Sequence, residues 1–84
     1  AIAVDHAADG IRALSLSPGA VLTSRLVARY GSAQAASAAL AGKYPAGRLG
    51  TAEEIAQTTV FLISDSASFI TGTDIRADGG YTAL

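Results

Sequence analysis

The stretch Ser17-Pro18-Gly19-Ala20-Val21-Leu22-Thr23 decides the fold expected for this chain. It follows a short apolar run, Ile11 to Leu16, in an expected strand over residues 11–17, and this run is typical of a parallel strand covered on both faces. Pro18 has no backbone N–H and biases the residue before it toward an extended conformation, so the strand is expected to end here. Gly19 lets the backbone pass close to another segment. A helical pattern begins at Ser24, which places the Pro-Gly pair in a loop between a strand and a helix.

This loop has two interpretations. Loops at the carboxyl ends of parallel strands are where open α/β sheets bind ligands. A Pro-Gly pair is also common in ordinary strand-to-helix turns. The seven residues alone favour the second, purely structural interpretation.

The composition limits the kinds of protein that this chain can be. Its 84 residues allow one small domain at most, half of them are hydrophobic and only 15% are charged. There is no Cys and a single His, so neither disulfides nor a Cys/His metal site stabilises so small a core. The net charge of −1 favours neither nucleic acid nor an anionic membrane. No run approaches the roughly 20 apolar residues that span a bilayer. We expect a soluble, cytoplasmic segment that leans on further protein.

Two helical regions flank the strand and loop. Residues 1–10 are typical of the end of a helix that stops at Gly10. His6 in this region is interpreted as a surface or interface histidine, since no second ligand or nucleophile lies near it. Residues 24–46 predict a pair of short helices, the second capped by Ser32. This pair carries many small residues, and a mobile lid over a substrate pocket and a simple packing excursion explain it equally well.

The long helix expected over residues 51–64 begins with a capping box. In Thr51-Ala52-Glu53-Glu54 the threonine can accept from the Glu54 N–H while the Glu54 carboxylate reaches back. An acid/base pair of Glu53 and Glu54 is the weaker interpretation, because both lie in the first helical turn. The helix is apolar over so much of its surface that we expect a sheet on one side and another element or subunit on the other.

A second strand is expected within residues 73–78. Polar residues alternate there with Ile75 and Ala77, a pattern typical of an edge strand. Two strands joined by a long helical connection predict a parallel pair, and Gly79-Gly80 then turns the chain.

Seven short motifs, in order and over nearly the whole chain, resemble the C-terminal part of the short-chain dehydrogenase/reductase family. They are Gly10-Ile11-Arg12, Ser17-Pro18-Gly19, Gly47-Arg48-Leu49-Gly50, Glu53-Glu54-Ile55-Ala56, Phe61-Leu62, Phe69-Ile70-Thr71-Gly72 and Asp78-Gly79-Gly80. The resemblance implies an α/β fold, with this chain as the C-terminal βαβ portion of a Rossmann-like, doubly wound parallel sheet.

The resemblance also implies a cofactor, NAD or NADP, and the residues that meet it. Pro18 and Gly19 would shape the loop at the nicotinamide end of the cofactor. The Val21 backbone would meet the carboxamide, and the Thr23 hydroxyl would bond the carboxamide or a phosphate. Residues 24–46 would form the substrate lid, while the 51–64 helix and the last strand would pair subunits of a homo-oligomer.

Other family features are missing from these 84 residues. There is no glycine-rich phosphate loop and no catalytic Tyr-x-x-x-Lys, since Tyr30 and Tyr44 have Gln34 and Arg48 four positions on. Leu14 stands where the family commonly has Asn. The resemblance therefore implies part of an NAD(P)-dependent oxidoreductase acting on an alcohol or carbonyl, with no catalytic residue in this segment. The alternative is a non-catalytic structural fragment that associates with itself.

Overall fold

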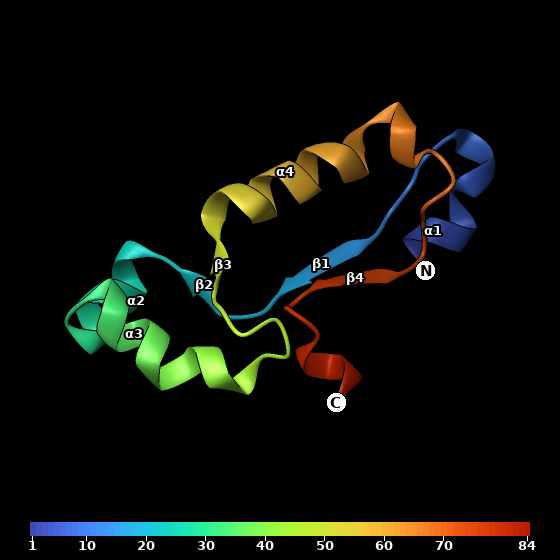
Figure 1. Cartoon of the computed structure of the whole chain (residues 1–84). Helices are drawn as coiled ribbons and strands as arrows, with labels where there is room; N and C mark the ends of the chain where they lie inside the picture. Colours follow the sequence, from blue (N-terminus) through green and yellow to red (C-terminus); the bar gives the residue numbers. More distant parts are fainter.

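The computed structural model describes all 84 residues, Ala1–Leu84, as an elongated α/β unit of 49 × 26 × 21 Å. A parallel strand pair forms its centre, and helix α4 (Ala52–Ile63) runs alongside the pair (Figure 1). Helices α2 (Ser24–Tyr30) and α3 (Ala33–Leu40) lie beyond one end of it. The Cα radius of gyration is 15.7 Å, against about 12 Å for a compact domain of this length. The chain is thus an open arrangement of elements around a small sheet.

The central pair consists of β1 (Ser15–Pro18) and β4 (Asp74–Ala77), which run parallel with Ser15 opposite Asp74 and Pro18 opposite Ala77. This confirms the expected α/β class and the parallel pairing. In β4, Ile75 and Ala77 are half-buried and alternate with the exposed Asp74 and Arg76, as the pattern predicted.

The first strand is shorter than the predicted 11–17. Gly72, at φ 72°, turns the opposing segment, so that a regular ladder cannot extend further back. There the Ala13 N–H donates to the Thr71 side-chain oxygen at 3.0 Å and the Ala13 C=O accepts from Gly72 N–H at 2.8 Å. Before Ser15, the Thr71 side chain thus takes the place of a backbone acceptor, and the regular ladder ends.

A second parallel pair was not predicted. It joins β2 (Val21–Leu22) to β3 (Gly50–Thr51), directly beyond the Pro-Gly pair. Two residues per strand are too few to give a periodic signal. This pair holds the start of α4 (Ala52–Ile63) next to the loop that follows β1.

The ends of the helices agree with the sequence predictions wherever a capping residue marks them. Helices α2 (Ser24–Tyr30) and α3 (Ala33–Leu40) lie within the predicted 24–46 region, and Ser32 caps α3 by accepting from Ala35 N–H at 3.0 Å. The capping box is present at the N-terminus of α4. Short 3₁₀ turns complete the chain: η2 (Ala41–Lys43), η3 (Asp65–Ala67) and η4 (Tyr81–Ala83).

The first helical region is interrupted. Helix α1 spans only Ile2–Asp5 and is followed by a 3₁₀ turn, η1 (Ala7–Asp9). Gly10 ends it at φ 77° as predicted, with Ile11 N–H donating to His6 C=O and Gly10 N–H to Ala7 C=O, a Schellman arrangement.

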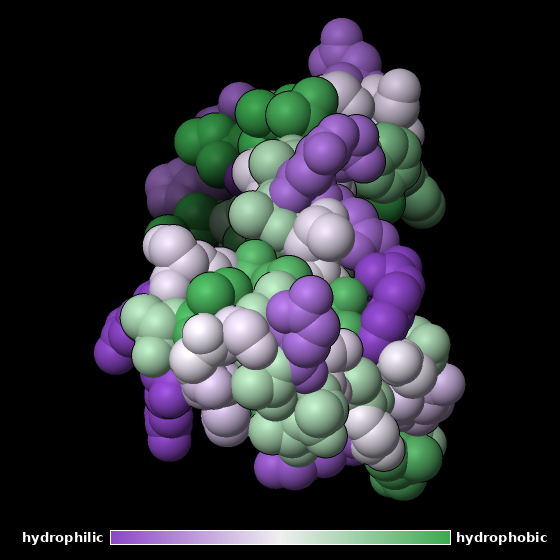
Figure 2. Space-filling view, turned by 60° about the vertical axis from the view of Figure 1, so that its left-hand side comes forward, coloured by the Kyte–Doolittle hydropathy of each residue, from purple (hydrophilic) through white to green (hydrophobic).

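Very little of the chain is buried. Five residues form the core, and no large side chain among them is fully enclosed: Ala3, Ala36, Leu49, Leu62 and Ala67. Apolar side chains gather in the upper part of Figure 2, the level at which α4 lies in Figure 1. Val60, Phe61 and Ile63 of α4 are 64%, 48% and 75% exposed. No helix is long and apolar enough to cross a membrane.

Candidate functional site

The backbone groups of the loop after β1 form hydrogen bonds with three different segments. Gly19 N–H donates to Ala77 C=O at 3.0 Å, which extends the β1–β4 ladder by one bond past Pro18. Ala20 N–H donates to Tyr44 Oη at 3.0 Å, and Ala20 C=O accepts from Gly50 N–H at 3.0 Å. The Gly19 N–H and both polar backbone groups of Ala20 are therefore already satisfied inside the chain.

Gly19 is required by close packing. A Cβ at this position would lie 2.9 Å from the Asp78 Cα and 2.9 Å from Tyr44 Cε1. Backbone atoms do not approach a real Cβ so closely, so a side chain here would displace the loop or the β4 turn. The prediction that Gly19 lets the backbone pass close to another segment is confirmed.

Val21 presents both of its backbone polar groups to an open edge. In a parallel pair, residues alternate between those whose N–H and C=O face the partner and those whose groups face away. The bond from Gly50 N–H goes to Ala20, and Val21 is the residue in register with Gly50. The Val21 N–H and C=O therefore face the side of β2 where no strand pairs.

Thr23 caps helix α2. Its side-chain oxygen accepts from Leu26 N–H at 3.2 Å, and the residue is exposed. Accepting this bond leaves the hydroxyl proton free to donate elsewhere. Capping and ligand binding are thus compatible roles of one hydroxyl.

Asp78 fixes the turn on which the loop rests. Its carboxylate accepts from Gly80 N–H at 3.1 Å and from the Thr82 N–H and hydroxyl at 3.1 and 2.7 Å. These bonds, that of the Thr82 hydroxyl above all, hold the pKa of the Asp78 carboxyl below its usual range. The carboxylate is a structural acceptor that ties the end of β4 to η4.

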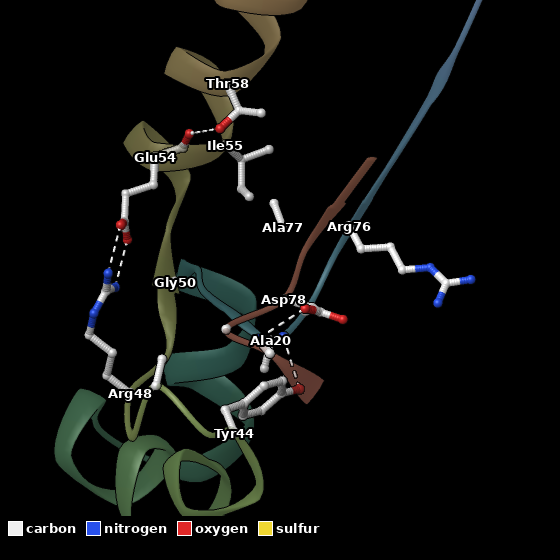
Figure 3. A pocket seen from close by; sticks show the side chains of 14 residues that line it. Ala20, Tyr44, Arg48, Gly50, Glu54, Ile55, Thr58, Arg76, Ala77 and Asp78 are labelled. Carbon is white, nitrogen blue, oxygen red and sulfur yellow. Dashed lines mark hydrogen bonds and ion pairs between the residues drawn. The ribbon is translucent and has the colours of Figure 1, made fainter. Parts of the chain in front are cut away.

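A cavity of about 390 Å³ lies between this turn, the loop and the first turns of α4 (Figure 3). On its rim Arg48 pairs with Glu54 through two bonds of 2.8 Å. The guanidinium, together with the Thr51 N–H, lowers the pKa of Glu54 to about 2. Glu53 instead contacts Gln57, at 3.3 Å. The two acids are therefore a cap and a surface group, and the weaker acid/base interpretation finds no support in their geometry.

The four predicted cofactor residues do not share one cavity. Pro18 and Gly19 line a second hollow of about 480 Å³ on the sheet side of the loop. Val21 and Thr23 line neither this hollow nor the first. Val21 lies on the open edge of β2, and Thr23 follows that strand as the cap of α2. An enclosed pocket at Val21 would therefore need further protein segments, beyond the elements that form these two hollows, to line it.

The family model described as enoyl-(acyl carrier protein) reductase matches residues 1–82. The chain belongs to the short-chain dehydrogenase/reductase family. It is 45% identical to the cis-4-hydroxycyclohexanecarboxylate dehydrogenase of Sinomonas cyclohexanicum, over 98% of this chain and 32% of that protein.

Solved structures of the family share this fold. One is a putative 2-deoxy-D-gluconate 3-dehydrogenase from Agrobacterium tumefaciens with bound NADP, with a TM-score of 0.83, 34% identity, and coverage of 99% of this chain and 33% of that one. Another is 4-hydroxyisoleucine dehydrogenase complexed with NADH, with the same TM-score and identity and coverage of 99% and 34%. The chain spans about a third of the length of the curated relatives it matches.

The sequence alone did not identify two residues that shape the loop after β1, Asp78 and Tyr44. Asp78 carried a signal, because Asp before Gly-Gly is typical of a turn in which the side chain bonds backbone N–H groups. Tyr44 carried none, since its contact with Ala20 spans 24 residues.

Proposed function

We propose that this chain is part of an NAD(P)-dependent oxidoreductase, which transfers a hydride between the nicotinamide cofactor and an alcohol or carbonyl substrate. Residues 18–23 supply the loop at the nicotinamide end, residues 24–46 a lid over the substrate, and α4 with β4 a contact surface between subunits. One observation carries the proposal: Val21 offers a free N–H and C=O at the carboxyl end of β1, next to the Thr23 hydroxyl.

The chemistry of this edge fits a nicotinamide. A carboxamide has an N–H₂ that donates and an oxygen that accepts, so it pairs with a backbone C=O and N–H on one residue. The Thr23 proton adds a donor for the carboxamide oxygen or a phosphate. When bound, the nicotinamide ring accepts or releases the hydride, and the residues of this loop would hold and orient that ring.

The group that moves the proton is not among these residues. Neither Tyr30 nor Tyr44 has a Lys four positions on. The proposed activity therefore belongs to the full-length protein that contains this segment. The relatives' substrates support a small alcohol or carbonyl as the substrate class, without selecting one.

The exposed apolar face of α4 supports assembly into a homo-oligomer. Val60, Phe61 and Ile63 lie within one helical turn and have no cover from the sheet. Burying an exposed Phe or Ile side chain is favourable by about 1.5–3 kcal/mol. A second copy of the protein or the remainder of its own chain would gain this energy by packing here.

The direct test is a turnover assay on the full-length protein. NADH or NADPH absorbance is followed with a panel of small ketones, and the oxidised cofactors with the matching secondary alcohols. The proposal predicts turnover with at least one pair and none with the 84-residue polypeptide alone. A full-length protein that binds neither cofactor would refute it.

The second candidate is a non-catalytic fragment that associates with itself, which the bare apolar face of α4 also favours. Mass spectrometry of the polypeptide isolated from its natural source separates the two. A mass near that of the full-length relatives supports the enzyme. A mass matching 84 residues, with self-association in sedimentation, supports the fragment.

A further inference from the structure

Tyr44 lies where the helical 24–46 region meets the loop after β1. It follows η2 directly in an extended conformation, at φ −111° and ψ 131°, and is half-buried. Its hydroxyl oxygen accepts from Ala20 N–H at 3.0 Å (Figure 3). A side chain at one end of the helical region thus bonds the residue immediately before Val21.

The tyrosine ring is fixed from several sides. Its Cε1 is among the atoms closest to Gly19, and its Cβ and Cδ1 face Gly79. The ring of Tyr81 packs against it with 5.3 Å between centroids and 42° between planes. The packing of the ring therefore holds the hydroxyl in place independently of its hydrogen bond to the loop.

The loop depends on this contact because it has few other anchors. Pro18 has no N–H to donate, so the backbone path is set at Gly19 and Ala20 alone. The Gly19 N–H and Ala20 C=O are held by β4 and β3, and the Ala20 N–H by the Tyr44 side chain. The Val21 N–H shares a planar peptide with the Ala20 C=O, which the Gly50 N–H holds from one side. The Tyr44 bond to the Ala20 N–H restrains the same residue from the other side. Releasing that N–H leaves this peptide with one anchor, about which it can pivot and re-aim the Val21 N–H.

We propose that Tyr44 is a positioning residue that fixes the Ala20 peptide, so that Val21 presents its N–H and C=O to the nicotinamide carboxamide. This rests on the proposed function. The Tyr44–Ala20 hydrogen bond would also connect the lid to the cofactor loop, because Tyr44 follows the helices that would cover the substrate. In this role Tyr44 acts through Ala20 and not by contact with the cofactor.

The test is Tyr44→Phe in the full-length protein, with Tyr81→Phe as the matched control. Both variants lose one hydroxyl from the same pair of packed rings, but Tyr81 forms hydrogen bonds only through its backbone. Losing a neutral hydrogen bond predicts a dissociation constant for NAD(P)H raised about three- to tenfold in Tyr44→Phe. Tyr81→Phe should bind like the wild type.

A ligand without nicotinamide separates positioning from general loss of structure. ADP-ribose, or its 2′-phosphate if the protein uses NADP, keeps the adenine and phosphate contacts. Its affinity should be unchanged in Tyr44→Phe. An equal loss of affinity for both ligands, or no loss for NAD(P)H, would overturn the proposal.

Amide hydrogen exchange without cofactor distinguishes a failure of the role proposed for Tyr44 from a failure of the proposed function. Tyr44→Phe should speed exchange of the Ala20 N–H by about three- to tenfold and leave α4 unaffected. Unchanged exchange at Ala20 would overturn the role of Tyr44, even in an active enzyme. If Ala20 exchanges faster in Tyr44→Phe but the wild type never binds NAD(P)H, the proposed function and the assignment of a ligand to this loop are refuted, while the Tyr44–Ala20 contact stands.

Discussion

At the scale of single residues, Thr23 combines a structural and a chemical role in one hydroxyl. The oxygen accepts from Leu26 N–H and caps α2, while the proton remains available to a ligand. A threonine or serine can do both, and a valine neither. Removing the hydroxyl therefore changes stability and affinity together.

For Thr23→Val in the full-length protein, we predict a loss of about 1 kcal/mol in unfolding free energy from the cap. We also predict a severalfold higher dissociation constant for NAD(P)H, since a neutral hydrogen bond contributes about 0.5–1.5 kcal/mol. Thr23→Ser is the matched control and should retain both properties. Thermal melting without cofactor and a binding titration measure the two separately. A lower melting temperature with unchanged affinity would restrict Thr23 to its cap.

Glu54 gives a prediction of pH dependence. Its pKa falls from 4.5 to about 2 in the folded chain because Arg48 and the Thr51 N–H bind the carboxylate. A lowered folded pKa adds stability that is fully present above about pH 4.5 and is lost as pH falls toward 2. The advantage of wild type over Glu54→Gln in melting temperature should therefore shrink as pH falls through this window. Glu53→Gln, next to it but bonded to Gln57, is the control. Parallel curves for wild type and Glu54→Gln would contradict the account.

At the scale of elements, the loop and the β4 turn behave as one unit. Gly19, Asp78 and Tyr44 meet within van der Waals distance, so the conformation of the loop depends on the turn that follows β4. The two segments lie almost 60 residues apart in sequence, yet neither can move without the other.

We predict that Gly19→Ala destabilises the full-length protein by about 1–3 kcal/mol through overpacking against the Asp78 backbone. It should also weaken NAD(P)H binding, because the displaced loop carries Val21 with it. Gly42→Ala is the matched control, since nothing lies within 4 Å of its added Cβ. Melting temperature and cofactor affinity measure both effects. Equal behaviour of the two variants would show that the close approach at Gly19 has no energetic consequence.

The elements that the sequence predicted well are those with local signals. Thr51, Ser32 and Gly10 mark helix ends through bonds within four or five residues, and each lies where its pattern predicted. The β2–β3 pair and the Tyr44–Ala20 bond join segments more than 20 residues apart and leave no periodic trace. The shortened start of β1 depends on Thr71 and Gly72, which sequence reasoning placed only as the approach to the second strand.

At the scale of the whole molecule, the chain exposes more surface than a self-contained domain does. Its accessible area is 5772 Å², against about 4,600 Å² for a folded monomer of this mass. Together with the bare side chains on α4, the excess supports a segment that packs against further protein. It agrees with the proposal that the activity belongs to a longer chain.

The central claim is that the open edge of Val21 receives the nicotinamide. Hydrogen–deuterium exchange of the full-length protein, saturated first with NADH or NADPH and then with ADP-ribose or its 2′-phosphate, tests it directly. The account predicts that the nicotinamide-bearing cofactor slows exchange of the Val21 N–H and that the truncated ligand does not. Equal protection by both ligands, or no protection of Val21 at saturating cofactor, would contradict it.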